Sequence, residues 1–303
     1  MTMVVADDPE TLDPHLAFHL NAGVDHVLVV APDARDGAAE VLESYAKGGH
    51  VRRVSARGAG AASSHTDLAR LAVAEHGADW VIPSTPREFW WPRGESLKDV
   101  LAVIPPRYGV VQALVREFAG RRGEGFFADE MTARTSLLAT GAGPVGSPRH
   151  LLRPIYRAEP EFELDSEDWT LAGRRVPLRA WYPIEVLHFS ASAQAGDDAS
   201  IEQRLAAGAL VVDTRLEDAL RGLRDAGGGT FALPAEGASR IAFPVPSIVD
   251  DASYAIECAA VGEVDLVRLD RHIRELEQRI AALEARFWPR VRGALRRLAR
   301  RPS

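Results

Sequence analysis

Residues able to bind an anion and to accept a proton follow a short apolar run, Trp80-Val81-Ile82. The run predicts a buried strand, and Pro83 and Pro86 are expected to end its ladder pairing. Arg87 can pair bidentately with a phosphate, while the adjacent Glu88 carboxylate can take a proton from a hydroxyl. In an open α/β sheet, ligands bind beyond the carboxyl ends of the strands. Chemistry is therefore expected at this turn.

Strands and helices alternate along the chain up to residue 115 and would place this turn at a sheet edge. Strands are expected at residues 3–6, 27–30, 51–55, 80–82 and 109–114, and helices at 10–22, 37–47, 66–76 and 97–103. A capping box, Ser96 with Asp99, opens the last of these helices. The alternation is typical of an α/β protein with a mostly parallel central sheet flanked by helices. A further strand at 184–190 and a helix at 215–226 follow.

The glycine-rich segment Gly58-Ala59-Gly60-Ala61-Ala62-Ser63 lies between a predicted strand and a predicted helix. This context suits a phosphate loop. A dinucleotide site, however, requires a third glycine and an acidic residue at the end of the next strand, ~20 residues further on. Here Ser63 replaces the third glycine, and no acidic residue occupies that position. A loop over a nucleotide is favoured over a dinucleotide-dependent oxidoreductase.

His15 and His19 are spaced to face the same side of the first helix, as two metal ligands would be. No glutamate lies between them and no third ligand is near. A structural role, such as a hydrogen bond to a carbonyl, is favoured.

Composition is that of a soluble globular protein of one large or two small domains. The chain has 303 residues, 46% of them hydrophobic and 26% charged, and a single cysteine, Cys258, which excludes an intrachain disulfide. No leader and no apolar run of ~18 residues is visible, so a cytoplasmic location is expected. The net charge is −7, and the last fifteen residues carry six arginines. The acidic remainder argues against binding to nucleic acid.

The segment Gly77–Ile82 followed by Glu88–Pro92 resembles the metal-site segment of family 2 glycosyltransferases with the GT-A fold, whose bacterial branch reads roughly gADWvinsDaDEFwwP. Asp129–Arg134 and Ile184–Ser190 match the same frame, and the resemblance covers roughly residues 3–205. It implies a GT-A type nucleotide-diphospho-sugar transferase fold over residues 1–262. It also implies a nucleotide-sugar donor and an acceptor whose identity the sequence does not give.

The chain departs from the family where the family holds its divalent cation. Thr85 and Arg87 replace the two metal-binding aspartates, and Trp169 and Ser192 replace groups that face the metal or the phosphates. Because these departures cluster, no bound metal is expected. Ala31 also replaces an aspartate that contacts the donor nucleoside in the family.

Ten residues are candidates for the site. The candidate catalytic residues are Asp168, Glu167, Glu88 and His188, and the candidate donor-binding residues are Asp7, Asp8, Asp36, Arg70, Arg87 and Thr85. For Asp36, capping of the following helix is favoured over ligand contact.

Two hypotheses are compatible with these residues. In the first, Arg87 replaces the cation and the chain transfers a sugar without metal, with Asp168, Glu167 or Glu88 as acceptor base. In the second, the site is inactive and the chain is a binding or scaffolding module, which the loss at Ala31 favours.

Residues 263–303 are predicted to form a helical extension. Apolar residues alternate in steps of three and four at 266, 269, 273, 276, 280, 283 and 287. This seam predicts either a coiled coil that joins two copies or a helix packed on its own domain. The arginines after Pro289 alternate with apolar residues, which suits either an anionic membrane surface, at the inner face of the membrane, or a solvated tail.

Overall fold

The computed structural model describes residues 1–5, 9–32, 34–55, 61–120, 125–136, 152–159, 176–178, 181–189, 198–234 and 241–243. All of them belong to one compact unit, Met1–Val261. The expected domain boundary at 262/263, the heptad helix and the basic tail lie outside the described residues and remain predictions. Oligomerisation and membrane contact through them remain predictions too.

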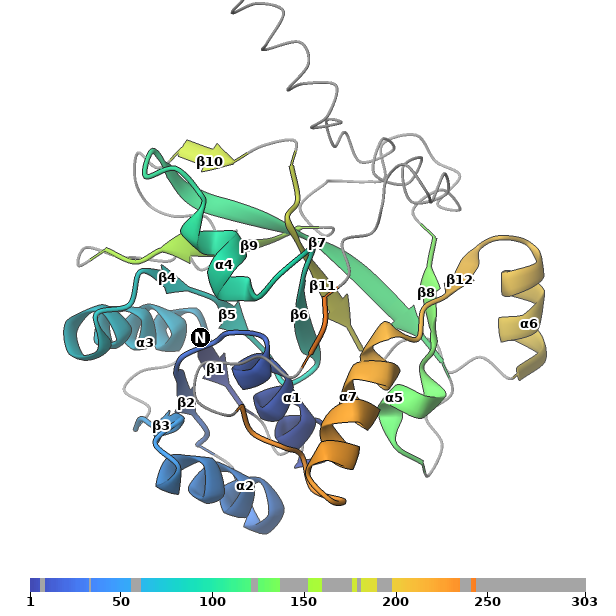
Figure 1. Cartoon of the computed structure of the whole chain (residues 1–303), viewed down its shortest axis with the longest axis horizontal. Helices are drawn as coiled ribbons and strands as arrows, with labels where there is room; N and C mark the ends of the chain where they lie inside the picture. Colours follow the sequence, from blue (N-terminus) through green and yellow to red (C-terminus); the bar gives the residue numbers. More distant parts are fainter. Residues whose placement is uncertain are drawn as a thin grey trace, which may run out of the picture. The chain divides into compact units, whose positions relative to one another are not determined.

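A first sheet of four parallel strands forms the N-terminal half (Figure 1). Its order is β3-β2-β1-β5, with β1 at Thr2–Val4, β2 at Val27–Val30, β3 at Val51–Arg53 and β5 at Pro83–Ser84. Helices α1 (Pro9–Asn21), α2 (Asp36–Lys47) and α3 (Ala61–His76) connect these strands. Strand β2 is buried along its whole length, as its four apolar residues require. The predicted α/β fold with a parallel sheet and helices is confirmed.

A second sheet of eight strands is mixed rather than parallel. Its strands are β4 (Trp80–Val81), β6 (Glu88–Pro92), β7 (Tyr108–Ala119), β8 (Ala133–Thr135), β9 (Leu152–Arg157), β10 (Val176–Leu178), β11 (Ile184–His188) and β12 (Leu210–Val212). The twelve-residue β7 pairs with four of them: β8 and β9 antiparallel, β10 and β11 parallel. Short helices α4 (Leu97–Ala102), α5 (Phe127–Glu130) and α6 (Asp198–Ala206) and the longer α7 (Arg215–Ala226) complete the described elements.

Residues 79–92 join the two sheets, which corrects one expectation. Pro83 was predicted to end ladder pairing, yet β5 lies parallel to β1, with Pro83 opposite Thr2. The Thr2 N–H donates to the carbonyl of Ile82 at 2.9 Å, so this contact needs no N–H from the proline. One chain segment thus contributes β4 and β6 to the mixed sheet and β5 to the parallel sheet.

Aromatic side chains fill the core between α1 and the mixed sheet. Phe18, Phe89, Trp90, Trp91 and Phe118 are all at most 3% exposed. Phe18 packs edge-on against Phe89 and stacks on Trp91. Helix α7 buries Leu216, Leu220 and Leu223 on one side. These contacts fix α1 and the strand β6 that follows the Arg87 turn.

Two other local expectations can be compared with the structure. The capping box of Ser96 and Asp99 is confirmed at the start of α4. Helix α3 begins at Ala61, earlier than the expected residue 66, so part of the glycine-rich segment is helical. Alanines 61 and 62 favour this because alanine has the highest helix propensity.

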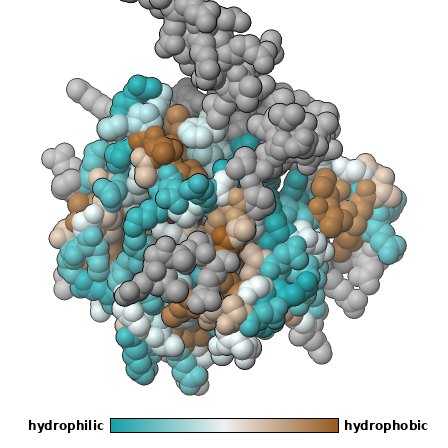
Figure 2. All heavy atoms as spheres, in the orientation of Figure 1, coloured by the Kyte–Doolittle hydropathy of each residue, from teal (hydrophilic) through white to brown (hydrophobic). Residues whose placement is uncertain are grey.

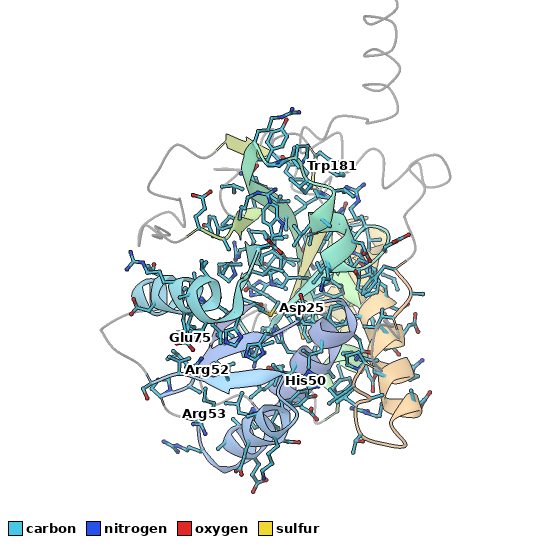
Figure 3. All side chains as sticks on the ribbon, turned by 60° about the vertical axis from the view of Figure 1, so that its left-hand side comes forward. Asp25, His50, Arg52, Arg53, Glu75 and Trp181 are labelled. Atoms are coloured by element: carbon cyan, nitrogen blue, oxygen red, sulfur yellow. The ribbon has the colours of Figure 1, made fainter. Side chains whose placement is uncertain are left out.

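Polar residues cover much of the surface in view (Figure 2). An ion pair between Arg52 and Glu75 joins β3 to α3 (Figure 3). A hydrophobic patch lies over β12, where Val211 and Val212 are exposed. None of the helices within the described ranges is long and apolar enough to cross a bilayer.

Candidate functional site

Three ionisable residues lie side by side on one face of the mixed sheet. In the pairing register, His188 of β11 is opposite both Glu88 of β6 and Glu117 of β7. Residues directly opposite each other on neighbouring strands project from the same face. The register therefore brings together two predicted catalytic residues, Glu88 and His188, and adds Glu117.

His188 and Glu117 form a hydrogen-bonded pair. The Nδ1 atom of His188 lies 2.8 Å from Oε1 and 2.9 Å from Oε2 of Glu117. Because a carboxylate only accepts hydrogen bonds, Nδ1 carries the hydrogen and Nε2 of the neutral ring is left as an acceptor. The His188 side chain is 22% exposed and that of Glu117 is 44% exposed. This pair can therefore take up a proton from a bound hydroxyl.

Glu88 is paired with a guanidinium from β9. Arg153 Nε donates to Glu88 Oε1 at 2.9 Å, and the Glu88 side chain is only 8% exposed. Arg153 is opposite Ala113 of β7. Ala113 and Glu117 lie on the same face of β7 because every second residue of a strand does, so Arg153 projects from the face that carries Glu117. The second oxygen of Glu88 accepts the backbone N–H of Thr85 at 3.0 Å. Glu88 thus holds the Thr85–Arg87 turn beside the mixed sheet.

Arg87 is anchored at the end of β11. Its Nη1 donates to the carbonyl of Phe189 at 3.4 Å, and the Phe189 N–H donates to the Arg87 carbonyl at 3.0 Å. The side chain is half-buried. A second cation besides Arg153 is therefore held near Glu88 and His188.

Two buried histidines of α1, His15 and His19, contact strand β6. His19 Nδ1 donates to the His15 carbonyl at 2.8 Å, and its Nε2 accepts the Trp90 N–H at 3.0 Å. Burial lowers the pKa of His19 to about 3, so the ring is neutral and can accept at Nε2. The predicted structural role, a bond to a carbonyl, is confirmed for His19, whereas neither ring nitrogen of His15 has a hydrogen-bond partner among the described residues. No cluster of three or more His, Cys, Asp or Glu side chains suited to a metal ion occurs within the described segments.

A buried ion-pair network lies on the opposite face of β7 and β11. Arg116 Nη2 is 2.6 Å from Glu185 Oε1, and Arg215 Nη1 is 2.5 Å from Glu185 Oε2. Burial alone would raise the pKa of Glu185, but the charges of Arg116 and Arg215 outweigh it and keep that pKa well below its usual value. Glu185 is therefore ionised, and it ties α7 to the two strands that carry His188 and Glu117.

The structure places four of the ten candidate residues together: Thr85, Arg87, Glu88 and His188. Asp7, Asp8, Glu167 and Asp168 lie outside the described residues. Arg70 is on the exposed side of α3. Asp36 is the first residue of α2 and Arg35 occupies the N-cap position, so the capping position predicted for Asp36 is wrong by one residue. The helix starts at Asp36 itself, which leaves Arg35 as the flanking extended residue.

Two residues of the site, Glu117 and Arg153, were missed. The expected strand ended at 114, before Arg116 and Glu117, whereas β7 continues to Ala119. No alternation of apolar and polar residues indicates this continuation, because residues 113–116 are all buried in β7. Arg153 could be identified only from the register of β9 on β7.

No protein-family model matches the sequence. No curated protein matches it either. Among solved structures, a mannosyltransferase from Pyrobaculum calidifontis in complex with GDP-Man and Mn2+ is similar, at 17% identity and a TM-score of 0.37. The similarity covers 67% of this chain, which spans 60% of that one.

Residues 1–349 of TarS from S. aureus in complex with UDP are similar at 15% identity over 75% of this chain and 72% of that one, with a TM-score of 0.38. The bifunctional WbbM apo structure matches 37% of this chain and 22% of its own, at 9% identity and a TM-score of 0.25. Identities this low and TM-scores below 0.5 leave the function of this chain to be inferred from its own residues.

Proposed function

We propose that this protein is a sugar transferase that takes its donor from a nucleotide sugar and does not use a carboxylate-bound metal. One observation supports this most: the His188–Glu117 pair and two guanidinium groups surround Glu88 where the two sheets meet. Sugar transfer needs a base for the acceptor hydroxyl and positive charge for the departing diphosphate. The described residues supply both.

The donor atoms at this turn do not fit a divalent cation. The two positions that carry metal-binding aspartates in the resembling family hold Thr85 and Arg87. A guanidinium cannot ligate Mg2+ or Mn2+, which prefer carboxylate and other oxygen donors. The carboxylate of Glu88 is already engaged by Arg153 and by the Thr85 N–H. The reaction proposed below therefore uses no metal ion.

His188 is the described residue best placed to be the base. Its Nε2 accepts a proton from the acceptor hydroxyl while Glu117 stabilises the imidazolium that forms. The hydroxyl oxygen then bonds to the anomeric carbon as the bond from that carbon to the diphosphate breaks. Arg87 and Arg153 offset the charge that the leaving group gains. Glu88 orients Arg153 and, through the Thr85 N–H, the turn that carries Arg87, and does not itself take the proton.

A thermal-shift screen tests the proposal. UDP and GDP, and sugar nucleotides built on each, are compared in EDTA and in Mn2+, with release of the nucleoside diphosphate measured in parallel. We expect at least one nucleotide to raise the melting temperature in EDTA, and Arg87→Ala to remove that rise. Arg107→Ala, which removes an exposed arginine outside the site, is the matched control.

Three outcomes are distinguishable. A shift that requires Mn2+ contradicts metal-free binding but keeps the donor class. Binding without diphosphate release favours the alternative of an inactive glycosyltransferase-like module. Absence of any shift, with wild-type protein folded by circular dichroism, contradicts the transferase proposal.

A further inference from the structure

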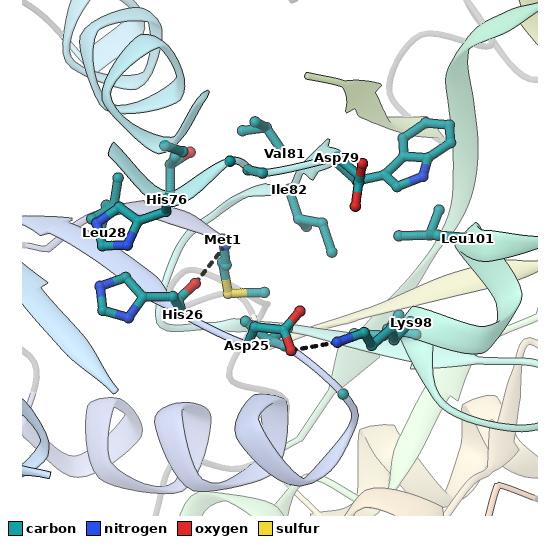
Figure 4. Close-up of a pocket in the computed structure, with 18 of the residues that line it drawn as sticks. Met1, Asp25, His26, Leu28, His76, Asp79, Val81, Ile82, Lys98 and Leu101 are labelled. Carbon is teal, nitrogen blue, oxygen red and sulfur yellow. Dashed lines mark hydrogen bonds and ion pairs between the residues drawn. The ribbon is translucent and has the colours of Figure 1, made fainter. Parts of the chain in front are cut away.

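A cavity lies at the edge of the parallel sheet opposite to the proposed site. Its volume is about 520 Å³, and its walls are formed by the residues that precede β1, β2, β4 and β5 and by the ends of α3 and α4 (Figure 4). The Thr85 turn follows β5 at its carboxyl end, whereas Ile82 precedes β5 and lines this cavity. A cavity of ~300–1,000 Å³ is of the size that binds small molecules.

The walls of this cavity are held by main-chain and side-chain contacts. The Leu97 N–H donates to the Ala22 carbonyl at 2.7 Å, which fixes the start of α4 against the end of α1. Gly23 has a φ of +101°, and a Cβ there would meet the Cβ of Ser96 at 2.9 Å. A larger residue at this position would therefore push the two walls apart. The cavity is formed before any ligand binds.

Charges within the cavity cancel. Lys98 Nζ lies 2.6 Å from Asp25 Oδ1. Arg157 donates to the carbonyls of Tyr108 and Ile104 at 3.1 and 3.0 Å, and its guanidinium lies 4.2 Å from the ring centroid of Trp80. With Asp79 as the second carboxylate, two cations face two anions. Burial lowers the pKa of the Met1 α-amino group, which also lines the cavity, to about 5, so this group is neutral at pH 7.

His26 adds no fixed charge to the cavity. The rings of His26 and His76 are stacked with centroids 4.2 Å apart. Burial and then the neighbouring His76 lower the pKa of His26, which is therefore neutral at pH 7. A ligand with a net charge of either sign gains little from such a lining.

Hydrogen-bonding groups and apolar surface alternate around the cavity. The Asp79 carboxylate is exposed and accepts no hydrogen bond from the part of the chain that the structure describes. Lys98 is a donor on the other side, and Ile82 and Leu101 lie between them (Figure 4). A ligand that satisfies this lining must donate and accept hydrogen bonds around an apolar body.

We propose that this cavity binds a neutral saccharide unit, with Asp79 accepting from its hydroxyl groups, Lys98 donating to them, and Ile82 and Leu101 contacting its C–H face. Sugar hydroxyl groups both donate and accept, and a sugar ring carries apolar C–H groups without a net charge. The site is separate from the proposed transferase site and does not depend on that activity.

Saturation-transfer NMR and calorimetry on the full chain test this site. The probes are neutral methyl glycosides and disaccharides at millimolar concentration, each compared with a charged counterpart, glucuronate or glucosamine, at pH 7. Asp79→Asn removes the carboxylate charge, and Ala102→Trp places a bulky side chain at the exposed Ala102 that lines the cavity. Glu40→Gln removes a negative charge from the exposed surface of α2 and is the matched control.

We expect a neutral saccharide to bind at millimolar concentration or tighter. Asp79→Asn is expected to weaken it about tenfold, the effect of one charge-assisted hydrogen bond. Ala102→Trp should abolish binding, and Glu40→Gln should leave it unchanged. Unaltered melting temperatures show that each variant is folded.

Three results overturn the proposal. They are binding of no saccharide by the wild-type chain, a preference of tenfold or more for a charged counterpart, and binding that both cavity variants retain. In the last case, loss of binding in His188→Asn assigns the saccharide to the transferase site. If the cavity binds no saccharide but the protein releases the diphosphate, only the saccharide site is contradicted. If the cavity binds a saccharide but no diphosphate is released, only the proposed transferase function is contradicted.

Discussion

The imidazole of His188 is held by Glu117, whose two carboxylate oxygens lie 2.8 and 2.9 Å from Nδ1. The two residues lie on adjacent parallel strands, so the contact is fixed by the pairing of β11 with β7 and not by a flexible loop. The hydrogen bond sets the tautomer of the ring and therefore decides which nitrogen can take a proton.

Glu117 is predicted to act on the reaction through His188. Glu117→Gln should lower kcat for diphosphate release about 10- to 100-fold and leave KM within about twofold, because the ring loses its charge partner but the donor keeps its contacts. In the 15N spectrum, the His188 ring of the wild type should carry its hydrogen on Nδ1, and that of the variant should show a mixture of tautomers. Glu95→Gln, on an exposed loop, serves as control. An unchanged tautomer together with an unchanged kcat would show that Glu117 has no positioning role.

The Arg153–Glu88 pair is predicted to contribute to stability. Arg153→Met leaves a carboxylate that is 8% exposed without its cation, and the free energy of unfolding should fall by about 2–3 kcal/mol. The loss is below the ~3–5 kcal/mol of a fully buried pair because Arg153 is 32% exposed. The double variant Arg153→Met with Glu88→Gln should recover more than half of the loss in urea titrations.

A surface pair provides the comparison for this measurement. Lys47→Met breaks the exposed pair with Glu43 and should leave the free energy of unfolding almost unchanged. Equal losses for Arg153→Met and Lys47→Met would contradict the stabilising role of the Arg153–Glu88 pair.

His19 is predicted to be needed for the position of β6. His19→Leu keeps the bulk of the side chain but leaves the buried Trp90 N–H without its acceptor, so the free energy of unfolding should fall by about 1–3 kcal/mol. Donor binding should weaken as well, because Glu88 is two residues before Trp90 on the same strand. Urea unfolding and nucleotide-induced thermal shifts measure the two effects. Full stability in the leucine variant would mean that the Trp90 N–H finds another partner.

Acidification is predicted to destabilise the fold through the buried histidines. Burial lowers the pKa of His65 to about 4 and that of His19 to about 3, whereas the unfolded chain has the ordinary value of 6.5. Below pH 6.5 the unfolded state therefore binds protons that the folded state does not. Stability should fall as the pH drops from 6.5 to about 4, by up to ~1.4 kcal/mol per pH unit for each histidine.

A variant separates this effect from that of the carboxylates. His65→Gln should reduce the slope of stability against pH between 6 and 4 by roughly the contribution of one group. An NMR titration of the wild type should place the midpoint of the His65 ring near 4. A midpoint near 6.5 would contradict the prediction.

Local sequence signals predicted the local elements well. The apolar run of β2, the capping box of α4 and the extent of α7 before Gly227 were all predicted from the sequence, because each depends on residues within one turn or one strand. The division of residues 79–92 between two sheets was not predictable in this way. It depends on which distant strand each residue meets, and Pro83 alone suggested the opposite.

Two residues of the described site were also beyond local reasoning. Glu88 was identified from its place beside Arg87 and His188 from the family resemblance, whereas Glu117 lay outside the expected strand, which ended at residue 114. Arg116 is buried only because Glu185, 69 residues later, neutralises it. This long-range ion pair allows β7 to continue past Arg116, and Glu117 is therefore part of the sheet.

The adjacency of Arg116 and Glu117 has a consequence for misfolding. Neighbouring residues of a strand project to opposite faces, so a slip of β7 by one position would move Glu117 towards Glu185 and Arg116 towards His188. The carboxylates of Glu117 and Glu185 would then meet in the interior, and Arg116 would take the place of Glu117 beside the imidazole of His188. The interior charges therefore disfavour a shifted register, and a chain with such a register would lose both the buried Arg116–Glu185 pair and the His188–Glu117 pair.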